Sequence, residues 1–127
     1  MNENELSYKI VGVALKLHKN IGPGLLESAY ENALAYDLRE MGLEVKQQVP
    51  MPFIYKEMRM DVGYRIDLLI ENSLIIEVKS IEGLAPVHYA QLLTYLKLSQ
   101  IKLGLLINFN CKLLKDGIHR VANNLQE

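Results

Sequence analysis

The amino-terminal part of the chain carries apolar residues at helical spacing. Within residues 6–19, four of them would share one face of a helix: Ile10, Val13, Ala14 and Leu17. Polar residues lie between them, so the pattern predicts an amphipathic helix. The Asn-Ile-Gly-Pro-Gly segment at residues 20–24 ends this helix, and Pro23 suits the first turn of a second helix that runs to about residue 41. Gly42 then stands where a helix C-cap is expected.

The middle of the chain changes to strand patterns. Residues 43–55 are rich in strand formers, but two prolines interrupt them, so we predict a strand with an irregular second half. A polar loop at residues 56–59 follows. Residues 61–70 and 74–80 are mostly apolar and flank a tight Glu-Asn-Ser turn, which predicts a β-hairpin.

The remaining segments complete an α/β arrangement. Residues 86–98 can form a helix that begins with a proline, and residues 102–109 are a nearly all-apolar run typical of a buried strand. Because a helix separates this run from the strand at 74–80, we expect the two strands to be parallel. A short final strand at 118–121 could follow a turn. The order of helices and strands predicts an α/β fold with helices on both faces of the sheet.

Composition limits the class of protein. With 127 residues, half of them hydrophobic, the chain should form one domain over residues 1–127 with a single core. Its apolar runs are too short to cross a membrane and its first residues lack a signal pattern, which predicts a cytoplasmic protein. Cys111 is the one cysteine and the three histidines lie far apart, which argues against a disulfide or a zinc site.

Net charge says little about a polyanionic partner. The formal net charge is −1, so there is no overall attraction to nucleic acid, although a local basic groove is compatible with it. The candidates for such a groove, each also readable as an ordinary solvated charge, are Lys56, Arg59, Lys112, Lys115, His119 and Arg120.

Charged residues interrupt both apolar strands of the predicted hairpin. Asp67 lies within Arg-Ile-Asp-Leu-Leu-Ile, and Glu77 and Lys79 end the next strand as Glu-Val-Lys. Strand alternation puts Glu77 and Lys79 on one face, and hairpin pairing brings Asp67 towards Glu77. Two adjacent carboxylates repel unless a cation lies between them, and oxygen ligands suit Mg²⁺ or Mn²⁺. Lys79 would then steady a metal-bound water or the charge on a phosphate.

Other interpretations of these charges stay open. The strand with Glu77 and Lys79 could be an edge strand whose solvated face carries a surface ion pair. Arg65 shares a face with Asp67 and could neutralise it, leaving a structural cluster of salt bridges. Glu27 could be a first-turn acid that complements the helix dipole.

Four short motifs occur in an order that resembles a known family. They are Gly-x-x-Glu-x-x-Tyr at residues 24–30, Tyr-Arg-Ile-Asp at 64–67, Glu-Val-Lys at 77–79 and Gln-Leu-Leu-Thr-Tyr at 91–95. With the apolar strand at 104–109, they resemble the GxxExxY family of the PD-(D/E)XK nuclease superfamily. Ile66 stands where the superfamily name has proline. The resemblance implies a restriction-endonuclease-like αβββαβ core with a mixed four-stranded sheet flanked by helices, and an extra N-terminal helix.

The resemblance also implies a site. By position, the catalytic residues would be Glu27, Asp67, Glu77 and Lys79. The ligands of a bound Mg²⁺ or Mn²⁺ would be Asp67, Glu77, the carbonyl of Val78 and Glu27. Residues on the substrate side would be Gln91 and Tyr95, with His88 one turn earlier, and Tyr30 on the face of Glu27. A position in the core is the other interpretation of Tyr95.

These features predict a metal-dependent phosphodiesterase that acts on nucleic acid, with DNA favoured over RNA. The alternative is a catalytically silent module of the same fold that binds nucleic acid or a protein partner. A homodimer formed through the apolar face of the first helix, around Ile10, Val13 and Leu17, is compatible with either function.

Overall fold

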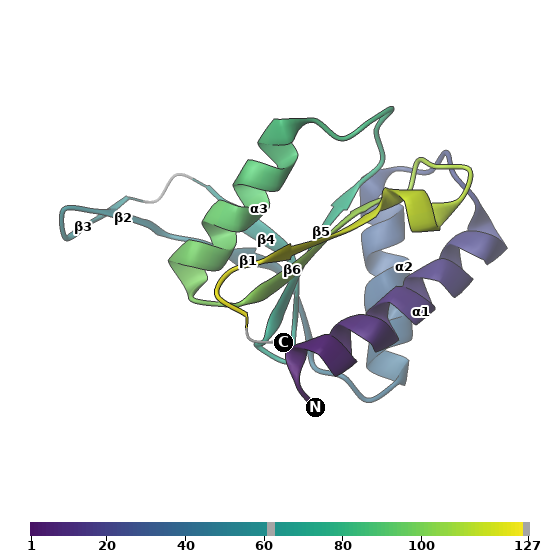
Figure 1. Ribbon diagram of the computed structural model, residues 1–127, viewed down its shortest axis with the longest axis horizontal. Helices are drawn as coiled ribbons and strands as arrows, with labels where there is room; N and C mark the ends of the chain where they lie inside the picture. Colours follow the sequence, from purple (N-terminus) through teal and green to yellow (C-terminus); the bar gives the residue numbers. More distant parts are fainter. Residues whose placement is uncertain (61–62, 126–127) are drawn as a thin grey trace.

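The computed structural model describes residues 1–60 and 63–125, in which helices cover both faces of a twisted sheet (Figure 1). The elements follow the chain as α1 (Glu3–Ile21), α2 (Glu27–Glu40), β1 (Val45–Pro50), β2 (Phe53–Tyr55), β3 (Met58–Met60), β4 (Arg65–Ile70), β5 (Leu74–Lys79), α3 (Pro86–Ser99), β6 (Leu103–Asn108), the 3-10 helix η1 (Leu114–Gly117) and β7 (Ile118–Ala122). Within the described residues, none of the helices has the length and apolar character needed to span a membrane.

The main sheet has the strand order β1-β4-β5-β6-β7. Its neighbours are antiparallel except β5 and β6, which are parallel because α3 carries the chain back across the sheet. The predicted hairpin and the predicted parallel pair are therefore confirmed. The sheet has five strands where four were expected, because the predicted short strand at the end of the chain joins it as β7.

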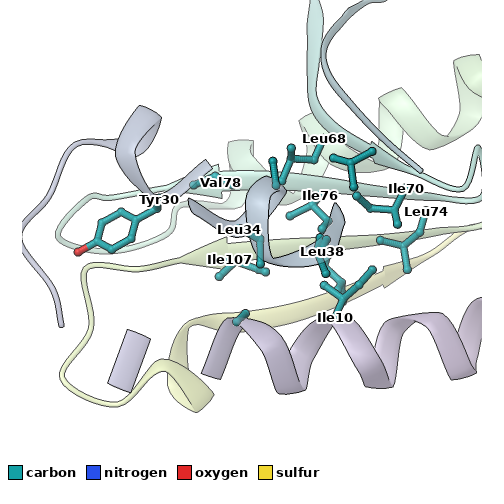
Figure 2. Close-up of a cluster of buried hydrophobic side chains, with 14 of the residues drawn as sticks. Ile10, Tyr30, Leu34, Leu38, Leu68, Ile70, Leu74, Ile76, Val78 and Ile107 are labelled. Carbon is teal, nitrogen blue, oxygen red and sulfur yellow. The ribbon is translucent and has the colours of Figure 1, made fainter. Parts of the chain in front are cut away.

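The two faces of the sheet bury separate cores, so the prediction of a single core is wrong. Helices α1 and α2 pack on one face, where Ile10, Leu34 and Leu38 meet sheet residues such as Ile76 and Ile107 (Figure 2). Helix α3 packs on the other face through Leu92, Leu96 and their neighbours. This second helix layer lies so close to β6 that a Cβ on Gly104 would come within 2.8 Å of Leu92.

The apolar face of α1 is used inside the protein itself. Ile10 is fully buried, Leu17 is buried, and Val13 packs against the same core. This face is therefore not available for the homodimer contact that the sequence suggested.

Three segments differ from the sequence-based prediction. Helix α2 begins at Glu27 and not at Pro23, because Gly22 and Gly24 adopt left-handed φ values of 80° and 103° in the loop before it. The expected polar loop at 56–59 is part of a separate hairpin, in which β2 and β3 pair across a turn at Lys56 and Glu57. The predicted strand at 61–70 begins at Arg65 in the structure, and its residues 61–62 lie outside the described part of the chain.

Candidate active site

Strands β4 and β5 stop pairing where the two acidic residues stand. Their ladder runs from Ile70–Leu74 to Leu68–Ile76 and ends there. Beyond it, side chains take over: the backbone N–H of Asp67 donates to Oε2 of Glu77 at 2.9 Å, and the N–H of Val78 donates to Oδ2 of Asp67 at 2.9 Å. Each carboxylate thus satisfies a main-chain donor of the opposite strand. The two acids are held side by side at the point of divergence.

Glu77 lies in an environment that disfavours its charge. Its side chain is buried, at 4% exposure. Burial, and then the nearby Asp67 carboxylate, raise the pKa of Glu77 from 4.5 to about 8, although the Asp67 N–H and the Lys79 ammonium act in the opposite direction. The positive charge of Lys79 does not offset the effects of burial and of the neighbouring carboxylate.

The structure excludes the two structural interpretations of these charges. Strand β5 lies between β4 and β6, so Glu77 and Lys79 are not on an edge strand. Among pairs of described residues, the one ion pair joins Lys46 and Glu44 at 3.5 Å, so Arg65 does not neutralise Asp67 through a salt bridge. The acids are therefore a cluster without a bonded cation.

Glu27 enters this cluster from the start of α2. Its Oε2 accepts a hydrogen bond from the N–H of Ser80 at 3.1 Å, which ties the helix to the residue after Lys79. The hydroxyl of Ser80 donates to the carbonyl of Leu25 at 2.7 Å and fixes the loop before the helix. Glu27, Asp67 and Ser80 line one cavity of about 550 Å³. The structure therefore brings the predicted helix acid and the hairpin acid to the same opening.

Comparison with known proteins agrees with this geometry. A family model described as the PD-(D/E)XK nuclease superfamily matches residues 4–121. The chain belongs to that superfamily. The mixed five-stranded sheet with helices on both faces confirms the predicted restriction-endonuclease-like fold. Neither the curated proteins nor the solved structures gave a match. The finer placement in the GxxExxY family stays a prediction from the motifs.

Two residues that the sequence analysis did not assign, Gln48 and Glu31, line the same cavity as Glu27 and Asp67. Gln48 has a left-handed φ of 51° in the middle of β1, opposite Asp67, where the ladder between β1 and β4 skips one pair. Its Nε2 donates to Oε1 of Glu31 at 2.6 Å and to Oδ1 of Asp67 at 3.2 Å. Gln48 therefore links an acid of α2 to an acid of β4.

The backbone at Gln48 explains this contact. In a regular strand, Gln47 and Gln48 would point to opposite faces. Here both side chains donate to the Glu31 carboxylate, with Gln47 Nε2 at 2.9 Å from Oε2. The left-handed backbone at Gln48 turns its side chain to the same side as that of Gln47. A left-handed residue other than glycine is strained, and such strain concentrates at functional sites. The sequence signal was a pair of glutamines in a strand, but alternation predicts only one of them beside α2.

The predicted substrate side is formed in part. Gln91 and Tyr95 of α3 line a second cavity of about 350 Å³. Tyr95 is buried, at 4% exposure, in the core cluster between α3 and the sheet, as the other interpretation of this residue predicted. Burial, followed by the charges of Glu77 and Asp67, raises its pKa to about 12. His88 instead caps the start of α3, where its Nδ1 accepts from the N–H of Ala85 at 2.9 Å.

Tyr30 has a different place from the one the sequence suggested. Its side chain is fully buried and belongs to the cluster drawn in Figure 2. Its ring stacks on Phe109 at 4.5 Å between centroids. The hydroxyl donates to the carbonyl of Gly22 at 2.6 Å and accepts from the N–H of Leu25 at 3.2 Å. Tyr30 therefore fixes the loop before α2 and offers no exposed surface to a substrate.

The carboxylates of Asp67 and Glu77 fit a hard divalent cation whose other ligands are water and substrate oxygens. Among the residues that the structure describes, no group of three or more His, Cys, Asp or Glu side chains forms a ready-made metal cage. Mg²⁺ does not need one, because it is commonly held by one or two carboxylates, waters and substrate phosphate. The raised pKa of Glu77 points the same way, since a cation between Glu77 and Asp67 would stabilise both carboxylates.

Proposed function

We propose that this protein is a metal-dependent nuclease that hydrolyses phosphodiester bonds, with DNA favoured over RNA as its substrate. The observation that carries the proposal is the pair Asp67 and Glu77, held together where β4 and β5 diverge, with Lys79 next on the same face of β5. Membership of the PD-(D/E)XK nuclease superfamily supports hydrolysis as the chemistry.

The acids would hold the metal. Asp67 and Glu77 would bind Mg²⁺ or Mn²⁺ together with the carbonyl of Val78, and Glu27 would bind through water or hold a second ion. When bound, the ion would supply a Lewis acid that activates water and stabilises the charge on the phosphate. The hydrogen bonds from the backbone of Asp67 and Val78 orient the two carboxylates before any ligand arrives.

The other residues would act on the nucleophile and the substrate. The Lys79 ammonium would orient the attacking water and stabilise negative charge that develops on the phosphate. Tyr95 keeps its proton at neutral pH, so its hydroxyl can donate a hydrogen bond to a phosphate or base beside the acids. Gln91 lines the same side and offers both a donor and an acceptor.

A cleavage assay tests the proposal. Labelled single- and double-stranded DNA and RNA would be incubated with Mg²⁺, Mn²⁺ or EDTA and with the wild type, Asp67→Asn or Lys79→Ala. Asp67→Asn keeps an oxygen that can accept from Val78, so it removes charge with little change in shape. The matched control is Lys9→Ala, an exposed lysine on α1 at the opposite face of the sheet.

We expect metal-dependent cleavage that both site variants lose and the control keeps. Cleavage by Asp67→Asn or Lys79→Ala at the wild-type rate would reject the site assignment. A folded wild type that cuts none of these substrates and binds no Mn²⁺ would instead favour the alternative, a silent module that binds nucleic acid or a protein.

A further inference from the structure

The hairpin formed by β2 and β3 exposes large apolar side chains next to α3. Along the chain it lies between β1 and β4, and it forms a separate two-stranded sheet that extends beyond the body of the protein (Figure 1). Strand alternation and the pairs Phe53–Met60 and Tyr55–Met58 put these four side chains on one face. Tyr55 and Met58 are 51% and 63% exposed. A two-stranded hairpin is marginally stable by itself, so an exposed apolar face on it indicates a binding surface.

This face continues into the cavity on α3. Phe53 lines the cavity of about 350 Å³ together with Tyr64, Gln91 and Tyr95, a volume within the range of small-ligand sites. The rings form two pairs that meet at this cavity. Tyr55 and Phe53 lie 6.3 Å apart between centroids, Tyr64 and Tyr95 lie 6.2 Å apart, and Phe53 and Tyr64 both line the cavity. At the inner end of this row, Tyr95 belongs to the same buried cluster as Leu69 and Ile75, which alternate onto the face of β4 and β5 that carries Asp67 and Glu77. The aromatic row therefore runs from the hairpin tip to the candidate active site.

One cation accompanies the outer rings. The Lys56 ammonium lies 5.4 Å from the centroid of the Tyr55 ring. Arg59 adds positive charge to the hairpin, but it pairs with Ile54 and lies on the face away from the rings. Glu57 at the turn is the one carboxylate in the hairpin, against these two cations. Within the cavity, Gln91 and Thr94 provide hydrogen-bonding groups. Aromatic faces, cations and a few polar groups are the combination with which proteins bind unpaired nucleotides.

We propose that the aromatic row Tyr55, Phe53 and Tyr64 binds a single-stranded stretch of DNA, with its bases stacked on the rings and its backbone leading to Asp67 and Glu77. This inference rests on the proposed nuclease function and names its substrate class. In duplex DNA the faces of the bases are already stacked on one another, so exposed rings favour an unpaired strand.

A second copy of this chain is the other occupant to consider. Two hairpins could associate through Tyr55 and Met58, but such an interface would not require the row to continue to Tyr95 and the acids. The continuity of the rings with the candidate site favours the substrate. The oligomeric state of the protein is therefore measured in the same experiment.

The test is binding, measured in EDTA so that no cleavage occurs. The anisotropy of a fluorescent oligothymidine and of a matching duplex would be titrated with the wild type, Tyr64→Ala, Tyr64→Phe and Tyr55→Ala. The control is Tyr8→Ala, since Tyr8 is an exposed tyrosine on α1 at the opposite face of the sheet. Thermal melts check that every variant is folded, and light scattering gives the mass of each.

We expect the wild type to bind the single strand more tightly than the duplex. Removing a ring should weaken binding of the single strand about 5- to 150-fold, as loss of one base–aromatic stack does. Tyr64→Phe keeps the ring and should bind like the wild type, as should Tyr8→Ala. Tighter binding of the duplex, or unchanged binding by both Tyr64→Ala and Tyr55→Ala, would overturn the inference. So would a dimer that only Tyr55→Ala dissociates.

Failure of this inference can be told from failure of the proposed function. Asp67→Asn should retain single-strand binding in EDTA while it loses cleavage in Mg²⁺. Cleavage of duplex alone, with the aromatic variants unaffected, would reject the single-strand inference and leave the nuclease proposal intact. Single-strand binding that depends on the rings, without cleavage of any substrate, would support the single-strand inference and reject the nuclease proposal.

Discussion

Glu77 should make the stability of the protein depend strongly on pH when no metal is present. Its pKa rises from 4.5 to about 8 in the folded protein, chiefly because it is buried beside Asp67. At pH values between these two, the folded state keeps a proton that the unfolded state has released. The free energy of unfolding therefore falls as pH rises through this window, and the loss is complete above pH 8.

The size of this effect follows from the shift. One pKa unit corresponds to about 1.4 kcal/mol, so moving from 4.5 to about 8 corresponds to roughly 5 kcal/mol between the ends of the window. The side chain is only 4% exposed, so solvent screening reduces this value little. Domains of this kind have a total stability of about 5–15 kcal/mol, so the change should be easy to detect.

Urea denaturation at a series of pH values in EDTA measures the effect. Glu77→Gln removes the titrating group but keeps an oxygen that can accept from the Asp67 N–H. This variant should lose most of the fall in stability between pH 5 and about pH 8, and it should be more stable than the wild type at the upper end. Glu82→Gln, at an exposed acid, is the matched control and should behave like the wild type.

Two results would refute this reasoning. One is a pH dependence of Glu77→Gln that equals that of the wild type. The other is an effect of the same size in Glu82→Gln. A third arm tests the link to metal: Mg²⁺ should stabilise the wild type at high pH and have little effect on Glu77→Gln, because a ligand stabilises only a state that binds it.

Three further changes test individual contacts, each by urea denaturation, with cleavage or binding as a second readout. Gln48→Gly should be more stable than Gln48→Ala by about 1 kcal/mol, because glycine accepts the φ of 51°, yet both should lower the cleavage rate; equal stability would contradict the backbone argument. Tyr30→Phe should lower stability by about 1 kcal/mol and leave nucleic-acid affinity unchanged, since its hydroxyl bonds internally; weaker binding would return Tyr30 to the substrate side. Gly104→Ala should cost about 1–3 kcal/mol because Leu92 must move, whereas Gly83→Ala, in open space, is its control; equal effects would reject the packing argument.

Periodicity predicted the parts of the fold that bury one face. The spacing of Ile10, Ala14 and Leu17 predicted α1, and they lie in the core. Apolar runs predicted the hairpin of β4 and β5 and the strand β6. All six residues of β6 are buried, so both of its faces are covered. These elements are set by burial, and burial leaves a direct trace in the order of apolar and polar residues.

Three other features could not be predicted from the pattern of apolar and polar residues. The β2–β3 hairpin exposes apolar side chains such as Ile54, so its pattern does not follow the rule of one buried face. The buried position of Tyr30 depends on Phe109, a partner that lies far along the chain. Gln48 breaks strand alternation through one left-handed residue. None of these three features follows from the order of apolar and polar residues along the chain.

The candidate site itself lies at the boundary between these two cases. The pairing of the hairpin predicted that Asp67 and Glu77 would be neighbours, and they are. Pairing alone would have continued the ladder through them, with both side chains pointing away from the sheet backbone. The carboxylates instead replace two ladder hydrogen bonds, and the strands separate. A sheet gives up regular pairing only where another requirement is stronger. Here it does so where two acids, Lys79 and the strained Gln48 meet, which is why the divergence of β4 and β5 is the strongest structural argument for catalysis at this position.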